Sequence, residues 1–456
     1  MTRRGLWLAL PGAILLSASP VLAGGGRDDE RAPRPARAAF ERRLARILRE
    51  RGVLADEDVT AAFPPPGGER TELEREVDRF LAEARPGRDG RLAAAGPGPD
   101  GLETPDGRFS LRFASTFQWR YEAVDADGTA ADPDGLAPPA RRDGESISLR
   151  RGHVFVEGHA LDPDLAYRFL VETPPSSVAL LDAWVEYRGL PPARIRLGQT
   201  KVPFGREAIS SSSELVFSER TRATSFFVPS RDGGAGLLVH GRALGADADL
   251  VECALGVFNG EGKNVSGNDG PGLLTIARAA VNPLGSPGYD GSDLGRGESP
   301  RLGVGAALAR HDDRTGGARL GSGRGPEASH PETTLFEADA AFKWRGLSIL
   351  GEWFASRVDS RDGEAAEASG GYAQAAVLLP GTDVEIGARR GLVVTRGSET
   401  FDQPRGRFSE WTAGAVWFVH GHRLEVHADW TRFRDEPSGG GGATEDVFRL
   451  QVQLTF

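Results

Sequence analysis

Five basic residues lie close together near the middle of the chain, and their side chains are of the kind that binds small anions. They are Lys201, Arg206, Arg220, Arg222 and Arg231. Each guanidinium presents a fixed fork of N–H donors that matches phosphate oxygens, whereas the lysine supplies a mobile point charge. Rings of such side chains bias selectivity where they line a pore. Binding of a small anionic substrate by these five residues is therefore the first hypothesis.

Four carboxylates are interleaved with these cations, so a structural role is the alternative. They are Glu207, Glu214, Glu219 and Asp232. Opposite charges this close in sequence can pair with one another and brace a long connection without meeting any ligand. The spacing does not say which cation meets which carboxylate, so both interpretations stay open.

Other chemistry has weaker support in the sequence. His420, His422 and His427 form an H-x-H-x4-H cluster, but a glycine between the first two indicates a turn, and no further ligand completes a metal site. A hydrolase would need His153 or His159 to activate a nearby serine, and no motif for such a pair is present. We therefore expect a protein that is not an enzyme and has neither a metal site nor a cofactor.

The last ten residues indicate the kind of element that carries these side chains. Residues 447–456 read VFRLQVQLTF, in which apolar and polar residues alternate. A two-residue period places the apolar side chains on one face of a strand and the polar ones on the other. A terminal strand that ends on an aromatic residue is typical of outer-membrane barrels. We expect its apolar face to meet lipid, and Arg449, Gln451 and Gln453 to line water.

Fifteen further segments have strand patterns, and long connections alternate with tight turns between them. This alternation is typical of an outer-membrane barrel whose short turns face the periplasm. Two connections break this alternation. The connection at residues 174–177 is short where a long loop is expected, and the one at residues 283–299 is long where a turn is expected. The expected strands are 108–123, 146–161, 164–173, 178–189, 193–202, 231–242, 247–259, 272–282, 300–311, 333–346, 347–358, 369–379, 382–396, 407–419, 421–434 and 445–456.

The predicted fold is therefore all-β, a sixteen-stranded antiparallel transmembrane β-barrel. The strand at 108–123 should pair with the one at 445–456 to close it. Sixteen strands leave an aqueous lumen instead of a packed interior. Arginines and carboxylates on the polar faces of the strands are mixed in sign, and we expect them to form solvated cross-strand pairs.

Composition supports this fold and limits the function. Mean hydropathy is −0.34, and no segment after the N-terminus approaches the eighteen consecutive apolar residues of a membrane-spanning helix. A barrel fits such a composition because only alternate residues face lipid. The formal net charge of −10 argues against nucleic acid as a partner, because that needs a basic footprint. The single cysteine, Cys253, excludes an intrachain disulfide.

The N-terminal part of the chain has a different character. A basic pair, an apolar run and small residues before a cleavage point indicate a signal peptide over residues 1–23. Residues 24–106 are expected to form a short helical periplasmic segment, either a small coiled coil or a disordered tether, that ends in a Gly/Pro-rich linker. The barrel then covers residues 107–456.

Several motifs between residues 146 and 260 together resemble the phosphate-selective porin O/P family. Their order and spacing make the resemblance specific, and it extends over roughly residues 108–456. The motifs are Ser148–His153 (SLRRGH), Leu181–Tyr187 (LDAWVEY), Leu197–Gly205 (LGQTKVPFG), Glu219-Arg220, Pro229–Gly234 (PSRDGG) and Gly256–Gly260 (GVFNG).

The resemblance implies a homotrimeric channel in the bacterial outer membrane, surrounded by lipid, through which small hydrophilic solutes and ions diffuse passively. It also implies that the long third loop, residues 203–230, folds into the lumen, which makes the five basic residues the expected contacts for small anions. A lysine-rich filter, which phosphate specificity would favour, is missing, since lysine occurs only at positions 201, 263 and 343. The alternatives are a barrel hydrolase and a structural tether through residues 24–106.

Overall fold

The computed structural model describes most of the chain after residue 100. The predicted signal peptide and the predicted helical segment lie outside the described residues. Within the range predicted as linker, the short strand β1 (Gly101–Glu103) pairs with β2. The described residues are 101–127, 143–173, 178–190, 192–229, 232–243, 250–265, 267–268, 272–312, 332–359, 365–396, 406–438 and 442–456.

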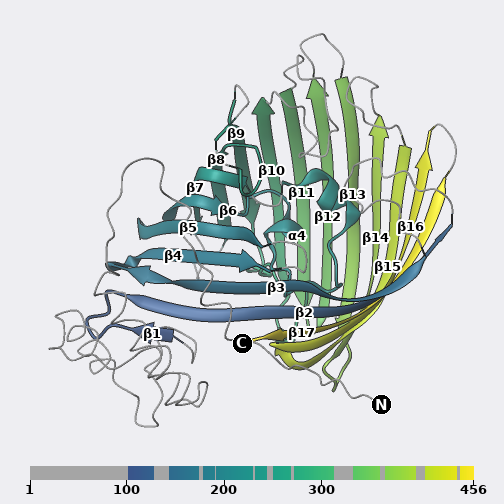
Figure 1. The fold of residues 1–456 in the computed structure, drawn as a ribbon, viewed down its shortest axis with the longest axis horizontal. Coiled ribbons are helices and arrows are strands. Elements are labelled where there is room, and N and C mark those ends of the chain that lie inside the picture. Colours follow the sequence, from purple (N-terminus) through teal and green to yellow (C-terminus); the bar gives the residue numbers. More distant parts are fainter. Residues whose placement is uncertain are drawn as a thin grey trace, which may run out of the picture. The chain divides into compact units, whose positions relative to one another are not determined.

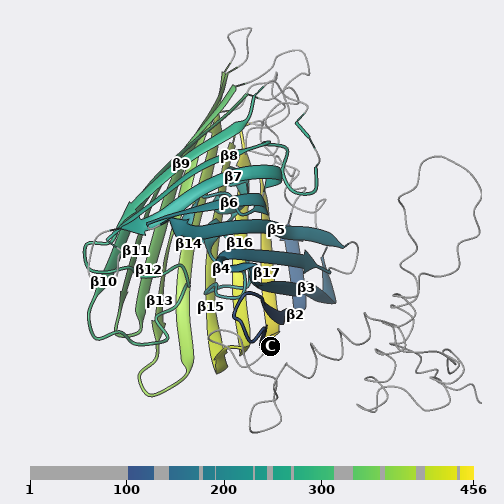
Figure 2. The same ribbon diagram turned by 90° about the vertical axis from the view of Figure 1, so that its left-hand side faces the viewer.

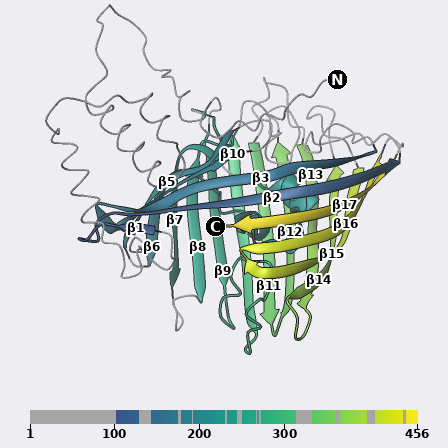
Figure 3. The same ribbon diagram turned by 60° about the horizontal axis from the view of Figure 1, so that its bottom comes forward.

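Sixteen antiparallel strands, β2 to β17, form one closed sheet (Figures 1 and 3). Each strand pairs with the next one along the chain, and β17 pairs with β2, as predicted for the two ends of the barrel. Each predicted strand corresponds to one of these, with ends that differ by a few residues. The strands are β2 Ser110–Asp127, β3 Gly144–Ala160, β4 Asp162–Glu172, β5 Ala179–Leu190, β6 Ala193–Thr200, β7 Asp232–Ala243, β8 Val251–Phe258, β9 Leu274–Val281, β10 Arg301–Asp312, β11 Glu332–Trp344, β12 Leu347–Asp359, β13 Ala365–Leu378, β14 Val384–Arg396, β15 Gly406–His422, β16 Leu424–Pro437 and β17 Ala443–Thr455.

The alternation of side chains along each strand separates an apolar face from a polar one. In β17, Leu450 is 42% exposed, whereas its neighbour Gln451 is 1% exposed. Trp119 in β2 and Trp411 in β15 are likewise exposed, with polar neighbours that are buried. The exposed apolar face is the one predicted to meet lipid.

One expectation for the polar face is wrong. Arg449, Gln451 and Gln453 were expected to line water, yet Arg449 is buried and the two glutamines are fully buried. The side-chain amide of Gln453 donates to the carbonyl oxygen of Ser213 at 3.0 Å, and that of Gln118 in β2 donates to Ser212 at 3.1 Å. The connection between β6 and β7 thus covers these side chains and excludes water from them.

Two connections pack against the polar face and fill part of the space that it surrounds. Residues 201–229, which we call the β6–β7 segment, contain α4 (Arg206–Ile209) and α5 (Arg222–Phe227). Residues 282–300, the β9–β10 segment, contain the connection 283–299, one of the two that break the predicted alternation. Among the described residues, no helix is long and apolar enough to cross a membrane.

The apolar core lies between α5 and strands β8 to β15. Phe227 of α5 is fully buried and stacks on Phe354 of β12, with ring centroids 5.3 Å apart. The same cluster includes Phe204 from the β6–β7 segment and Tyr372 from β13. This side of the barrel is therefore packed, and β4 to β7 form the opposite wall (Figure 2).

Candidate functional site

A cavity of about 1650 Å³ lies mainly between strands β2 to β8 and the β6–β7 segment. Its lining is strongly basic, because twelve lysine and arginine residues face four carboxylates and two histidines. The basic residues are Arg112, Arg150, Arg151, Arg168, Arg188, Arg194, Arg196, Lys201, Arg220, Lys263, Arg278 and Arg423. The carboxylates are Glu172, Asp182, Glu214 and Glu252, and the histidines are His153 and His240.

Cross-strand pairing holds several of these arginines in place. Glu186 of β5 is fully buried and lies opposite Arg196 of β6, whose Nε donates to Glu186 at 2.7 Å. Arg188 and His240 contact the same carboxylate at 2.8 and 2.7 Å. The guanidinium of Arg196 also stacks on Trp184, 4.1 Å from the ring centroid. The predicted cross-strand ion pairs are thus present, and they fix cationic groups in the cavity wall.

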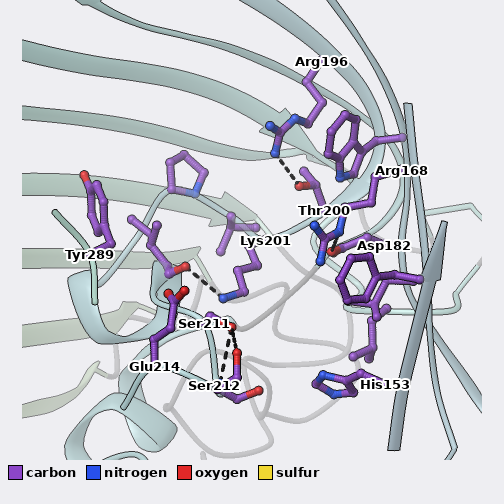
Figure 4. A pocket seen from close by; sticks show the side chains of 18 of the residues that line it. His153, Arg168, Asp182, Arg196, Thr200, Lys201, Ser211, Ser212, Glu214 and Tyr289 are labelled. Carbon is purple, nitrogen blue, oxygen red and sulfur yellow. Dashed lines mark hydrogen bonds and ion pairs between the residues drawn. The ribbon is translucent and has the colours of Figure 1, made fainter. Parts of the chain in front are cut away.

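Two of the five predicted residues, Lys201 and Arg220, line the cavity. The ammonium of Lys201 donates to the carbonyl oxygen of Ile209 at 2.9 Å and to that of Ser210. Arg220 also donates to the Ser210 carbonyl, at 2.8 Å, and to that of Glu207. Figure 4 shows Lys201 and Glu214 on the segment, with Arg168, Asp182 and His153 on the facing wall.

Two further predicted residues, Arg206 and Arg222, do not line the cavity. The guanidinium of Arg206 lies 3.4 Å from Asp339 of β11, stacks on the ring of Tyr289 and donates to the carbonyl oxygen of Gly288. Arg222 pairs with Asp435 of β16. Both arginines thus tie the segment to the barrel wall, through strand carboxylates and not through the interleaved carboxylates of the alternative interpretation. The fifth predicted residue, Arg231, lies outside the described residues.

Glu219, just before α5 in the segment, contacts three arginines at once. Its Oε1 lies 2.5 Å from Arg120 and 2.6 Å from Arg150, and its Oε2 lies 2.7 Å from Arg151. Burial alone would raise the pKa of Glu219, but the three guanidiniums outweigh it and hold the pKa well below the ordinary value. The carboxylate is therefore ionised at neutral pH.

The main-chain N–H groups of the segment bind carboxylates on the packed side of the barrel. Glu352 of β12 accepts from the backbone of Arg206 at 2.7 Å and from that of Glu207 at 2.6 Å, at the start of α4. Glu410 of β15 accepts from the backbone of Arg222 at 2.9 Å, at the start of α5. The segment therefore covers acidic side chains on one side of the barrel and leaves the basic wall open.

Sequence reasoning concentrated on the β6–β7 segment and did not select the wall arginines as site residues. A signal for them existed, because Arg150, Arg168, Arg188 and Arg196 fall on the polar faces of successive strands. The sequence does not show that the segment covers the acidic side and leaves these arginines facing a cavity.

The histidines singled out earlier have structural partners. His422 and His427 both contact Glu425, each at 2.9 Å. His159 hydrogen-bonds to Ser110 at 2.7 Å and to the carbonyl oxygen of Gly107 at 2.8 Å. These contacts tie neighbouring strands and turns together.

Comparison with known proteins identifies the family to which this chain belongs. Residues 158–456 match the family described as phosphate-selective porin O and P. The chain belongs to this family of porins. It is therefore a channel protein of the bacterial outer membrane, with its apolar face in contact with lipid. No curated protein matches the chain by sequence.

Solved structures similar to this porin share its fold at low sequence identity. The outer-membrane channel DcaP of Acinetobacter baumannii has 10% identity and a TM-score of 0.53, covering 78% of this chain and 100% of that one. An anion-selective porin from Comamonas acidovorans has 12% identity and a TM-score of 0.50, covering 76% and 100%. The trimer form of OmpT, an outer-membrane protein of Vibrio cholerae, has 8% identity and a TM-score of 0.50, covering 76% and 99%.

Proposed function

We propose that this porin is a passive diffusion channel that prefers small anions and that the basic cavity is its pathway. The observation that carries this proposal is the lining, in which twelve basic residues outnumber four carboxylates. Fixed charge of one sign in a narrow, low-dielectric passage raises the local concentration of the opposite ion. An anion should therefore be favoured over a cation in this cavity.

The β6–β7 segment is, in this proposal, the inward-folded third loop that narrows the channel. Its contacts with polar side chains of β2, β11, β12, β15, β16 and β17 support this position, since those strands extend around about half of the ring. Lys201 and Arg220 would then meet passing anions, whereas Arg206 and Arg222 would hold the loop. Arg231 stays a candidate anion contact from its sequence position alone.

A specific phosphate filter is not part of the proposal, although the family is described as phosphate-selective. Arginine dominates the lining, and only Lys201 and Lys263 contribute ammonium groups to it. Arginine forks bind carboxylates and sulfates as well as phosphates. We therefore propose a general preference for small oxyanions and chloride over cations.

The remaining parts of the proposal concern assembly and export. We propose a homotrimer, supported by the trimer form of the similar OmpT structure, and a purely conducting role without catalysis. Residues 1–23 would be removed as a signal peptide, and residues 24–106 would form a flexible or helical periplasmic segment followed by a linker, at whose end β1 lies.

Planar-bilayer recording of the purified protein tests the proposed function. In a gradient of potassium chloride, the reversal potential should have the sign of a chloride-preferring channel. The preference should weaken as ionic strength rises, because salt screens the wall charges. A reversal potential of the opposite sign would refute the proposal.

A further inference from the structure

We propose that the outer surface of strands β14 to β16 binds the phosphorylated headgroup of a lipid in the outer leaflet of the membrane. The binding groups are five arginines on the face of these strands that points away from the lumen, which we call the outer arginine patch. This partner does not depend on which solute the channel conducts. The patch comprises Arg390, Arg396, Arg407, Arg432 and Arg434.

The two-residue period of the strands directs these arginines outward. In β14, Arg389 is buried and forms its ion pairs inside the barrel, so the next residue, Arg390, points to the outside. The guanidinium of Arg390 lies 4.8 Å from the ring centroid of Trp411, which is 54% exposed on the outer face of β15. Arg432 of β16 contacts the ring of Trp430 in the same way, at 5.3 Å. The two rings therefore hold two guanidiniums on the surface that faces lipid.

The charged residues of β16 and β17 lie where the apolar band of the barrel ends. In β17 the outward residues are apolar from Phe448 to Phe456, a length close to the roughly nine to eleven residues with which a tilted strand crosses a bilayer. The next outward residue is Asp446, which lies opposite Arg432 of β16. These side chains are therefore placed at an edge of the membrane, where the apolar interior meets the lipid headgroups.

This edge is the extracellular one. The connection 397–405 joins β14 and β15 next to the patch, and the long connections 128–143 and 313–331 join strands at the same end of the barrel. At the opposite end, only Arg423 separates β15 from β16. Longer loops are extracellular in outer-membrane barrels, and short turns are periplasmic. The patch therefore faces the outer leaflet, whose lipids carry phosphate groups.

The described carboxylates do not balance the charge of the patch. Three of the five arginines form ion pairs with outward carboxylates of β13, β16 and β17. No described carboxylate lies within ion-pair distance of Arg390 or Arg407, so positive charge is in excess in the described part of this surface. The three pairs are Arg396 with Glu367 at 3.6 Å, Arg432 with Asp446 at 2.8 Å and Arg434 with Glu436 at 2.9 Å.

The arrangement of the arginines fits a headgroup with two phosphates. Arg390 and Arg432 lie opposite Trp411 on its two sides, in β14 and β16, and Arg407 lies on the same outer face of the central strand (Figure 1). Two strand spacings separate the outer pair by about 10 Å. Guanidinium forks bind phosphate oxygens, and basic groups at a membrane surface attract anionic headgroups. The acyl chains of such a lipid would lie along the apolar band.

Native mass spectrometry of the detergent-purified full-length protein tests this proposal. The probe is diphosphoryl lipid A, and monophosphoryl lipid A shows what the second phosphate contributes. For Arg390→Gln/Arg407→Gln, the concentration of diphosphoryl probe at half-saturation should rise at least about tenfold, because two arginines that attract the headgroup are lost. The native preference for the diphosphoryl probe should shrink as well. Chloride conductance like that of the native protein shows that the variant barrel is folded.

The matched control is Arg310→Gln/Arg357→Gln. It also removes two outward arginines, but these lie on β10 and β12 and pair with Glu332 and Asp359. Its affinity for the probe should stay close to native. Unchanged binding in Arg390→Gln/Arg407→Gln, or an equal loss in both double variants, would overturn the proposal.

Two other occupants of the patch give distinct results. Displacement of the diphosphoryl probe by an equal concentration of inorganic phosphate would mean that the patch binds free anions, not a lipid. Dissociation of the oligomer in Arg390→Gln/Arg407→Gln, with probe binding unchanged, would mean that the patch contacts a second copy of the chain. Either result would overturn the proposal. A cation-preferring reversal potential would instead overturn only the proposed function.

Discussion

Arg206 and Arg194 show how two arginines of the same interior differ in role. The side chain of Arg206 is 4% exposed and lies among Asp339, Gly288 and Tyr289. Arg194 of β6 is exposed and lines the cavity. The donors of Arg206 are therefore used inside the protein, whereas Arg194 lies at the cavity that we propose as the anion pathway.

This contrast predicts opposite effects of two alanine substitutions. Arg206→Ala should lower the free energy of unfolding by about 3 kcal/mol, because Asp339 is left buried with one partner fewer. Its reversal potential in a salt gradient should change little. Arg194→Ala should leave stability within about 0.5 kcal/mol of native but reduce anion preference. Thermal unfolding in detergent and bilayer recording measure the two effects, and a selectivity loss confined to Arg206→Ala would contradict this division of roles.

The sequence predicts the chemistry of such residues but not their partners. Lys201, Arg206, Arg220 and Arg222 are equally good candidates for anion contact by type and spacing. Their division into two cavity residues and two bracing residues depends on Asp339 and on Asp435, more than a hundred positions away along the chain. Long-range register of this kind is set by the closed sheet and cannot be read from a local pattern.

At the scale of elements, the β6–β7 and β9–β10 segments stabilise one another. The backbone N–H of Gly291 donates to the carbonyl oxygen of Glu214 at 2.7 Å, and Tyr289 stacks against Arg206. Ser292 of the second segment also donates to Glu385 of β14 at 2.5 Å. The unusually long connection at 282–300 therefore supports the loop that shapes the cavity.

Packing of α5 predicts how the β6–β7 segment responds to a core mutation. Phe227→Ala should cost about 3–5 kcal/mol, because it removes a fully buried ring that stacks on Phe354. A loosened segment should also raise single-channel conductance and current noise. Phe448→Ala is the control, since that ring lies on the exposed apolar face. Equal conductance changes in both variants would show that α5 does not position the segment.

The strands were predictable because a two-residue period leaves a signal at every position. All sixteen have counterparts, and so does the tight turn at His420–Gly421, where Arg423 donates to the carbonyl oxygen of His420 at 3.2 Å. Gly421 has a φ of 56°, which glycine adopts without a Cβ penalty. The two segments were not predictable in the same way, because their apolar residues have no fixed period and their partners lie on distant strands.

For the whole molecule, ion selectivity should depend more on where the charged residues lie than on the net charge of the chain. The chain is acidic, with a formal net charge of −10, yet the open cavity is basic. Part of the difference arises because main-chain donors of the β6–β7 segment cover Glu352 and Glu410, while Ser292 covers Glu385. The interior is therefore divided into a covered acidic side and an open basic side.

This division predicts that water and ions reach only one side of the barrel interior. Ser212 lines the cavity, whereas Ser356 of β12 is 5% exposed on the packed side. Each can be changed to cysteine in a Cys253→Ala background, because Cys253 is the single native thiol. At Ser212→Cys, an anionic thiosulfonate reagent should react several times faster than a cationic one, since the basic wall concentrates anions. Ser356→Cys should react slowly with both reagents. Fast modification of Ser356→Cys, or faster reaction of the cationic reagent at Ser212→Cys, would contradict a one-sided basic pathway.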